Sequence, residues 1–317
     1  MAKNENLITA KNAKKDEFYT QLEDINAEMI YYESQLKGKT ILMNCDDPTW
    51  SNFWRYFHIE FERLGLKKII STHYEAGETP SYKMEYEGGN DEDFEVGIRT
   101  ELAQNGDFRS SECIELLKEA DIVVTNPPFS LFRDYVGLLM EHKKKFIIIG
   151  NVNALTYKEI FPLIKANKLW FGASIHSGDR KFYVPDDYPL NASGCGIDAD
   201  GKRFIRVKGV RWYTNMDYAA RHKDLETVYL SSKKDELYPE LYPKYDNYDA
   251  INVDKTNEIP MDYKGIMGVP ITFLDKYNPE QFEIVGNEYS LNIDKGRGYI
   301  SGKRMYSRIF IRRKEGK

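Results

Sequence analysis

Short apolar runs alternate with amphipathic segments over the first half of this chain. The runs are apolar at consecutive positions: Thr40–Asn44, Lys68–Thr72, Asp121–Thr125, Lys145–Gly150 and Leu169–Phe171. The segments with apolar residues at helical spacing lie between them: Trp50–Leu64, Ser111–Glu119, Leu131–His142 and Tyr157–Asn167. Strands that alternate with helices and are apolar on both faces are typical of a parallel sheet covered by helices on each side. The pattern predicts a doubly wound α/β domain.

Two further segments do not follow this alternation, one ahead of it and one within it. Asp16–Leu36 has apolar residues at helical spacing and predicts a helix that packs on the sheet domain. Glu75–Glu95 concentrates acidic residues and glycines, which predicts a solvated surface loop.

The composition of the chain changes after about Pro185. β-rich pieces follow at Arg203–Lys208, Val210–Asn215, Gly268–Leu274 and Tyr306–Arg312. A tyrosine-rich irregular stretch, Ser231–Asp262, is too long for a simple connector and is expected to bind a ligand or to wrap another part of the molecule. We therefore expect a catalytic domain at residues 1–185 and a β-rich recognition region at residues 186–317.

Composition narrows the class of protein. The chain has 317 residues, of which 41% are hydrophobic, and a formal net charge of −5. Its longest apolar stretches, such as Phe146–Ile149, are far shorter than the roughly 20 residues of a membrane-spanning helix. Met1–Lys15 shows no secretory signal, so a cytoplasmic protein is expected. The three cysteines, Cys45, Cys113 and Cys195, exclude a disulfide scaffold and show no metal-ligand spacing, and no metal is expected.

The most specific chemical signal follows the third predicted strand. This strand ends in Asn126, Pro127, Pro128 and Phe129, and Ser130 is expected to cap the next helix. In open α/β sheets, ligands bind outside the carboxyl ends of the strands, where this tetrapeptide is expected to lie. The alternative is a plain turn, since Asn-Pro and Pro-Pro mark turns in any protein.

The tetrapeptide suits chemistry on an aromatic amino group, whose lone pair is delocalised into its ring. Hydrogen bonds from the amine to the side-chain carbonyl of Asn126 and the backbone carbonyl of Pro127 would localise that lone pair. Prolines fix φ and lack an N–H, so the carbonyls are held rigidly. Phe129 offers a flat face on which a base can stack.

At these residues the sequence resembles the adenine-specific DNA methyltransferases, and among them the EcoRI-type modification methylases. The resemblance covers nearly the whole chain. Besides Asp121–Phe132, it rests on Asp16–Gln21, Asn44–Pro48, Asn105–Glu112, Pro243–Asn252 and Gly268–Leu274. It implies a Rossmann-like methyltransferase fold with S-adenosylmethionine as methyl donor and a β-rich target-recognition region.

The resemblance assigns the cofactor site to a defined set of positions. The implied cofactor-binding residues are Phe18, Tyr19, Thr20, Asn44, Cys45, Asp46, Asp107, Phe108 and Asn126. Asp46 could meet the cationic amino-acid end of the cofactor. Asp107 could accept a hydrogen bond from the cofactor adenine while Phe108 covers its ring. Either aspartate could instead be a helix cap or part of a solvated turn.

One departure keeps an inert DNA-binding protein as an alternative. Methyltransferase motif I is usually glycine-rich, because its backbone approaches the cofactor, whereas Asp46–Asn52 contains no glycine. The EcoRI-type enzymes share this departure. Glu75 is a candidate for the acidic residue that holds the cofactor ribose.

Gly178–Pro185 resembles the segment that lines the target-base pocket. Phe182 or Tyr183 is the expected second wall around an extruded adenine, opposite Phe129. An aromatic pair in a strand can also belong to the core, and that alternative stays open.

Basic residues cluster in the C-terminal half, where phosphate contacts are expected. The negative net charge averages these clusters with the acidic stretch at Glu75–Glu95, which is expected to face away from DNA. For the last cluster, Arg304–Arg313, the alternative is a solvated lysine-rich tail. The expected DNA-binding residues are Arg203, Arg206, Lys208, Arg211, Lys303, Arg304 and Arg308.

Together these features predict a site-specific DNA adenine N6-methyltransferase that flips its target base. The expected partners are double-stranded DNA and, acting separately, a cognate restriction endonuclease. No membrane partner is expected, and we expect a cytoplasmic monomer that associates with the nucleoid through DNA. An RNA guanine-N2 or protein glutamine methyltransferase is the nearest alternative, because the same tetrapeptide occurs in both.

Overall fold

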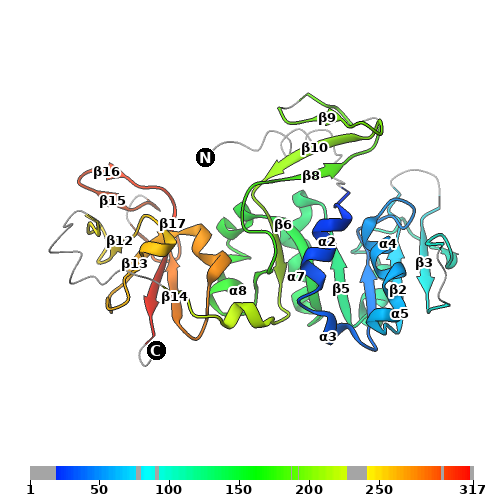
Figure 1. The fold of residues 1–317 in the computed structure, drawn as a ribbon, viewed down its shortest axis with the longest axis horizontal. Helices are drawn as coiled ribbons and strands as arrows, with labels where there is room; N and C mark the ends of the chain where they lie inside the picture. The colour runs from blue at the N-terminus through cyan, green and yellow to red at the C-terminus, as the bar shows by residue number, and fades with distance from the viewer. Residues whose placement is uncertain are drawn as a thin grey trace. The chain divides into compact units, whose positions relative to one another are not determined.

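The computed structural model describes residues 19–75, 80–89, 93–186, 188–191, 193–226, 241–293 and 296–314 (Figure 1). The chain divides into two compact units, which are described separately here. Unit 1 comprises Met1–Leu163 and Leu169–Asp217, and unit 2 comprises Ile164–Lys168 and Tyr218–Lys317. The expected boundary at residues 185 and 186 therefore falls inside unit 1. The assignment of catalysis and DNA recognition to separate regions stays a prediction.

A large mixed sheet forms the centre of unit 1. Within the described residues it has eight strands in the order β4 (Ile98–Glu101), β3 (Tyr82–Tyr86), β2 (Lys68–Thr72), β1 (Thr40–Met43), β5 (Ile122–Thr125), β6 (Lys145–Asn151), β11 (Val210–Thr214) and β7 (Trp170–Phe171). The neighbours β2, β1, β5 and β6 run parallel, and the other pairs are antiparallel. The prediction of an all-parallel sheet is thus correct for the four central strands only.

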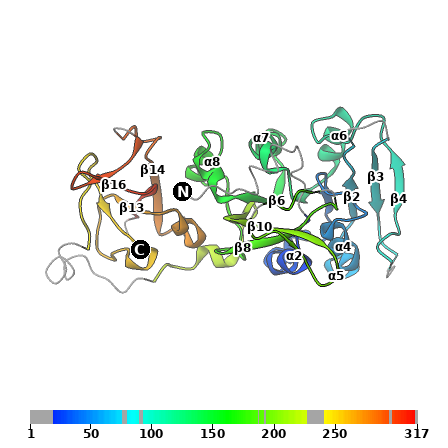
Figure 2. The same ribbon diagram turned by 90° about the horizontal axis from the view of Figure 1, so that it is seen from above.

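Helices cover both faces of this sheet, as Figure 2 shows. One face carries α6 (Ser111–Glu119) and α7 (Phe132–Glu141), and the other carries α2 (Leu22–Met29), α4 (Asn52–Ile59) and α5 (Phe61–Leu64). The remaining short helices of the described chain are α3 (Glu33–Leu36), α8 (Phe161–Lys165), η1 (Phe129–Leu131), η2 (Val152–Thr156), η3 (Ala219–His222), η4 (Thr256–Glu258) and η5 (Ile271–Lys276). Because both faces are covered, all residues of β1, β5 and β11 are buried.

Two expectations about unit 1 need correction. The acidic stretch Glu75–Glu95 is not only a surface loop, because its middle forms β3, an inner strand of the sheet. Tyr82, Met84 and Tyr86 alternate along β3 and are buried, and this pattern is hard to see among so many acidic neighbours. The predicted run at Leu169–Phe171 pairs antiparallel with β11, a strand that the sequence analysis did not place in this sheet.

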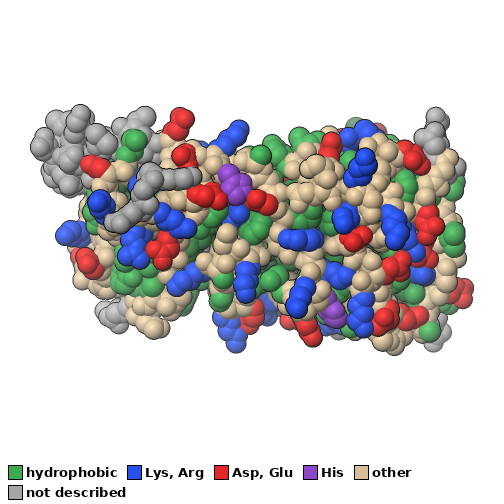
Figure 3. Space-filling model, turned by 90° about the horizontal axis from the view of Figure 1, so that it is seen from below, with side chains coloured by type: hydrophobic (Ala, Val, Ile, Leu, Met, Phe, Trp, Pro, Cys, Tyr) green, Lys and Arg blue, Asp and Glu red, His purple; other side chains and the backbone are tan. Residues whose placement is uncertain are grey.

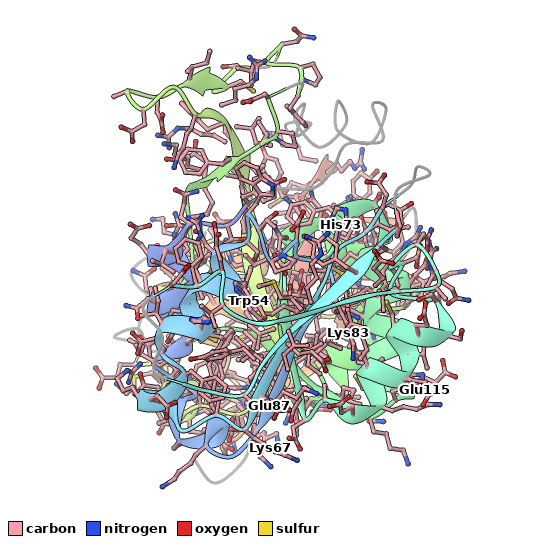
Figure 4. All side chains as sticks on the ribbon, turned by 90° about the vertical axis from the view of Figure 1, so that its right-hand side faces the viewer. Trp54, Lys67, His73, Lys83, Glu87 and Glu115 are labelled. Carbon is pink, nitrogen blue, oxygen red and sulfur yellow. The ribbon has the colours of Figure 1, made fainter. Side chains whose placement is uncertain are left out.

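A small antiparallel sheet also belongs to unit 1. It consists of β8 (Asp179–Tyr183), β10 (Arg203–Lys208) and β9 (Gly196–Ile197). In Figure 4 this sheet stands beyond the end of the large sheet at which His73, the residue after β2, is labelled. Lys67, which precedes β2, lies at the opposite end. The small sheet therefore lies at the carboxyl ends of the parallel strands.

Unit 2 is built on a four-stranded sheet within the described residues. Its order is β12 (Ile251–Asn252), β13 (Met267–Pro270), β17 (Arg308–Arg313) and β14 (Phe282–Asn287), beside a two-stranded hairpin of β15 (Tyr299–Ile300) and β16 (Lys303–Arg304). Tyr245, from the tyrosine-rich stretch, packs in its core with Ala250, Ile293 and Phe310. The described part of that stretch therefore contributes to the core of unit 2.

Candidate active site

Three loops converge at the carboxyl ends of the parallel strands of unit 1. The loop after β1 contacts the loop after β5, since the backbone N–H of Cys45 donates to Oγ1 of Thr125 at 3.2 Å. The loop before α6 contacts the end of β2, where the N–H of Glu75 donates to the carbonyl of Asn105 at 2.9 Å. Gly106 makes this approach possible, because its φ is +76° and a Cβ there would lie 2.0 Å from the carbonyl oxygen of His73.

The predicted catalytic tetrapeptide, Asn126–Phe129, lies at this edge, immediately after β5. Asn126 is 7% exposed, Pro127 is buried, and Pro128 and Phe129 are half-buried. The predicted cap by Ser130 is wrong: α7 begins at Phe132 after the 3₁₀ turn η1, which contains Ser130, and no side chain caps it. The 3₁₀ turn η1, which follows Pro128, therefore lies between β5 and α7 where a capping serine was expected.

Asp46, expected to bind the cofactor, connects the β1 loop to the tetrapeptide. Its Oδ2 accepts hydrogen bonds from the hydroxyl of Thr125 and from the backbone N–H of Asn126, the latter at 3.2 Å. Its Oδ1 accepts from Ser51, the residue that caps α4, at 3.1 Å. The carboxylate therefore fixes the backbone at the start of the tetrapeptide.

Asn44 and Thr20 are buried polar residues beside this network. The Asn44 side-chain oxygen accepts a hydrogen bond from the hydroxyl of Tyr135 on α7. Its Nδ2 is buried and makes no hydrogen bond within the described chain, and the same holds for Oγ1 of Thr20. The side chain of Asn52, on α4, donates to the Thr20 carbonyl at 2.7 Å and holds the N-terminal segment in place.

Cys45 lies in the loop after β1, and Asp107 and Phe108 lie in the loop before α6. Burial, followed by the neighbouring Asp46, raises the pKa of the Cys45 thiol, so the thiol stays protonated near neutral pH. Both oxygens of Asp107 accept hydrogen bonds from Arg109, which lower the pKa of Asp107. Phe108 is buried edge-on to Tyr135, with ring centroids 4.9 Å apart. Phe108 is only 4% exposed, and the guanidinium of Arg109 lies over its ring, 5.1 Å from the centroid.

The predicted base-pocket segment contacts the N-terminal segment. Tyr19 and Tyr183 form an isolated antiparallel bridge with N–H to carbonyl distances of 2.9 and 3.2 Å. Phe182 is 1% exposed and packs in the interior, whereas Tyr183 is half-buried and donates its hydroxyl to Asp198 at 2.8 Å. Tyr183 is the more accessible of the two candidates, and the ammonium groups of Lys181 and Lys202 lie over its ring, 4.5 and 5.4 Å from the ring centroid. Phe18 lies outside the described residues.

Two of the predicted DNA-binding arginines are buried, which corrects the expectation that they face solvent. Arg211 is 4% exposed in β11, a strand covered on both faces, and donates to the carbonyl of His176. Arg308 is 9% exposed in β17 and donates to Asn252 and Asp254. Both guanidinium groups donate hydrogen bonds to other parts of the protein.

The other predicted DNA-binding side chains are at least partly accessible. Arg203 is half-buried and donates to the carbonyl of Tyr188 at 2.7 Å. The exposed members of the predicted set are Arg206, Lys208, Lys303 and Arg304. The amino-end side of unit 1, on the right in Figure 3, mixes acidic and basic side chains without a large patch of one sign.

Comparisons with known proteins agree with this arrangement. The profile of the family described as adenine-specific methyltransferase EcoRI matches residues 6–314. The chain belongs to the EcoRI family of adenine-specific methyltransferases. It is 47% identical to the type II methyltransferase M.EcoRI of Escherichia coli, over 99% of this chain and 98% of that protein. It is 41% identical to M.MpnI of Mycoplasma pneumoniae, over 96% and 97%, and 39% identical to M.MgeORF184P of Mycoplasma genitalium, over 96% and 98%. No solved structure gives a significant match.

Membership of the EcoRI methyltransferase family implies the use of S-adenosylmethionine, and the residues at the strand ends fit that group. The unbonded Nδ2 of Asn44 and Oγ1 of Thr20 are a buried donor and a buried hydroxyl from different segments. Leaving such groups unbonded costs free energy, which a polar ligand would recover. The site also contains residues to which the sequence analysis gave no role: Ser51 and Thr125 bond to Asp46, and Tyr135 bonds to Asn44. They become recognisable only through these contacts.

Metal and membrane features complete the description of this methyltransferase. Over the residues that the structure describes, no group of three or more His, Cys, Asp and Glu side chains is arranged to hold a metal ion. No helix of the described chain is long and apolar enough to cross a membrane. The expectation that the enzyme uses no metal stays a prediction.

Proposed function

We propose that this enzyme methylates N6 of adenine at specific sites in double-stranded DNA, as the modification enzyme of a restriction–modification system. The main support is the position of Asn126, buried at the carboxyl edge of the parallel strands with its backbone held by Asp46. The naming of the relatives as type II methyltransferases agrees with this function.

In this proposal, the chain activates the amine by position and hydrogen bonding. The side-chain carbonyl of Asn126 and the backbone carbonyl of Pro127 accept hydrogen bonds from N6 and localise its lone pair. Pro127 and Pro128 keep the loop rigid, so little conformational freedom is lost when the base arrives. S-adenosylmethionine supplies an electrophilic methyl group when bound. No general base is needed, since the proton leaves after transfer.

The target adenine must leave the duplex to reach this loop, which costs a few kcal/mol that stacking and hydrogen bonding offset. Phe129 forms one wall of the proposed pocket, and it is half-buried beside the prolines. Tyr183 is the proposed second wall, because it is half-buried whereas Phe182 is only 1% exposed. The bridge between Tyr19 and Tyr183 supports a proposal in which the cofactor segment lies next to the pocket segment.

The cofactor site is proposed to lie in a Rossmann-like arrangement at the same edge. Asn44 and Thr20 are its best-supported members, because their unbonded polar atoms are buried there. Tyr19, Cys45 and Phe108 are proposed to line it through backbone and ring contacts. Asp107 is proposed to take part as an acceptor beside its pairing with Arg109.

Recognition of duplex DNA is proposed for the small sheet of unit 1 and for the C-terminal region, whose exposed basic side chains suit phosphate contacts. Arg203 is included as a half-buried member. We further propose that the enzyme acts as a cytoplasmic monomer and that a separate endonuclease cleaves the unmodified site. The exposed basic residues proposed for this role are Arg206 and Lys208 in unit 1 and Lys303 and Arg304 in unit 2.

Transfer of a tritiated methyl group to duplex DNA, ribosomal RNA and release factor, measured in parallel, tests the substrate class. We expect labelling of duplex DNA alone. Labelling of RNA or protein without DNA would contradict the proposal and favour the guanine-N2 or glutamine alternative. Binding of S-adenosylmethionine without transfer to any of the three would also contradict it.

A further inference from the structure

The carboxylate of Asp46 is the direct link between the loop after β1 and the catalytic tetrapeptide. It is 8% exposed, and both of its oxygens accept hydrogen bonds from the protein. Two of the three donors, the Thr125 hydroxyl and the Asn126 N–H, lie at the end of β5. Asp46 therefore contacts the tetrapeptide at its first residue.

Backbone pairing does not supply this link. The ladder between β1 and β5 pairs Ile41 with Ile122 and Leu42 with Val123, before the catalytic loop begins. Beyond it, the hydroxyl of Thr125 joins the two chain segments, accepting from the Cys45 N–H and donating to Asp46. Hydrogen bonds to a carboxylate are stronger than neutral ones and gain further from burial.

The loop that contains Asp46 is also held by hydrogen bonds from β2 and from the start of α4. The hydroxyl of Ser71, at 0% exposure on β2, donates to the backbone carbonyls of Asp46 and of Met43. Ser51 caps α4 and donates to the Asp46 carboxylate. The backbone of Asp46 is therefore held from β2 and its carboxylate from the start of α4, which is the kind of support that a positioning group requires.

We propose that Asp46 is a positioning residue for methyl transfer, which acts through Thr125 and the backbone of Asn126 to hold the Asn126 carbonyl where the target amine can donate to it. This inference rests on the proposed role of Asn126. It differs from the role that the sequence suggested, a direct contact with the cofactor. Errors of about 1 Å in such positioning can cost roughly 100-fold in rate.

The test compares D46A and T125V with wild type by single-turnover methylation at saturating S-adenosylmethionine, and by calorimetric measurement of cofactor affinity. We expect each variant to lose about 10- to 100-fold in the rate of transfer, with the dissociation constant of the cofactor within about threefold of wild type. The double variant D46A/T125V is expected to lose less in rate than the product of the two single losses, because both changes remove the hydrogen bond between the Thr125 hydroxyl and Asp46.

T214V is the matched control. Thr214 is also a fully buried threonine of the large sheet, and its hydroxyl donates to the carbonyl of Phe146 near the start of β6, away from the catalytic edge. We expect T214V to keep the wild-type transfer rate even if its melting temperature falls. If D46A does not fold, the transfer rates of T125V and T214V still show whether the hydrogen bond between Thr125 and Asp46 contributes to methyl transfer.

Two results would overturn the inference. One is a D46A enzyme with a normal rate at saturating cofactor and a weakened cofactor affinity, which is the signature of a cofactor ligand. The other is a T125V enzyme as active as T214V. Failure of the proposed function is separate: it would appear as full activity of N126A, whatever the Asp46 variants do.

Discussion

At the residue scale, the catalytic edge holds an ion pair that has no sequence motif. Nδ1 of His73 lies 3.0 Å from Oδ2 of Asp47, and the hydroxyl of Tyr82 donates to Oδ1 of Asp47 at 3.0 Å. The hydrogen bond with Asp47 raises the pKa of His73. Burial alone would raise the pKa of Asp47, but hydrogen bonds from His73 and Thr49 outweigh it and lower this pKa to about 2. Both groups are therefore charged over a wide pH range.

This pair makes folding stability depend on pH in a defined direction. A histidine whose pKa is raised by folding stabilises fully below its unfolded pKa of about 6.5 and loses that contribution as the pH rises through the folded value. An aspartate with a lowered pKa stabilises above its unfolded value of about 4 and loses the contribution as the pH falls toward 2. The contribution of the pair is therefore largest between about pH 4 and pH 6.5.

We expect H73N to cost more free energy of unfolding at pH 5.5 than at pH 9, as measured by urea denaturation. The reason is that the wild-type protein loses the charged interaction at the higher pH. In a D47N background the pH dependence of the H73N effect should become smaller, and the interaction of His73 with Glu75, 3.6 Å away, should account for what remains. An equal cost of H73N at both pH values in the wild-type background would contradict this account.

The residue scale also shows what a sequence can and cannot predict. The sequence correctly predicted that the tetrapeptide at Asn126 directly follows a buried parallel strand, and its catalytic role stays a prediction. The basic residues were judged by composition, which does not reveal side-chain direction. Arg211 lies between β6 and β7 in a strand buried on both faces, so it bonds inward instead of facing DNA.

At the element scale, α2 is anchored by a buried carboxylate. Glu28 is 0% exposed and accepts four hydrogen bonds, which come from the hydroxyl of Tyr32, the N–H of Ala173, and the N–H and hydroxyl of Ser174. Burial raises the pKa of Glu28, and the bonds from Ser174 and its neighbours oppose that rise. The helix is thereby joined to the segment that leads from β7 to β8.

E28Q is expected to lower the free energy of unfolding by about 1–3 kcal/mol, because its NH₂ group would face donors that need an acceptor. Chemical denaturation at pH 7 measures the change. E23Q, on the exposed side of the same helix, is the matched control and should cost less. Equal costs for E28Q and E23Q would contradict the anchoring role of Glu28.

Periodicity predicted most elements of unit 1 but not all of them. The buried parallel strands β1, β2, β5 and β6 were correctly placed, because continuous apolar runs identify strands covered on both faces. β3 was missed, because its alternating apolar residues lie within an acidic stretch. β11 was recognised as β-rich, but its pairing with β6 depends on tertiary contacts that no local pattern encodes.

At the scale of the whole molecule, the chain has a formal net charge of −5, although it belongs to the EcoRI family of adenine-specific methyltransferases. The charge is an average over segments, and DNA responds to the local surface within a screening length of about 8–10 Å. The exposed members of the predicted DNA-binding set lie on β10 in unit 1 and on β16 in unit 2. Net charge alone is therefore a poor guide to whether this protein binds DNA.

The identity of the methylated nucleoside tests the central claim most directly. Duplex DNA that carries the recognised site is incubated with enzyme and S-adenosylmethionine, digested to nucleosides and analysed by mass spectrometry. The account predicts N6-methyl-2′-deoxyadenosine as the methylated product of the wild-type enzyme, and none from N126A that binds the cofactor normally. Methylation of a different base, or full activity of N126A, would contradict it.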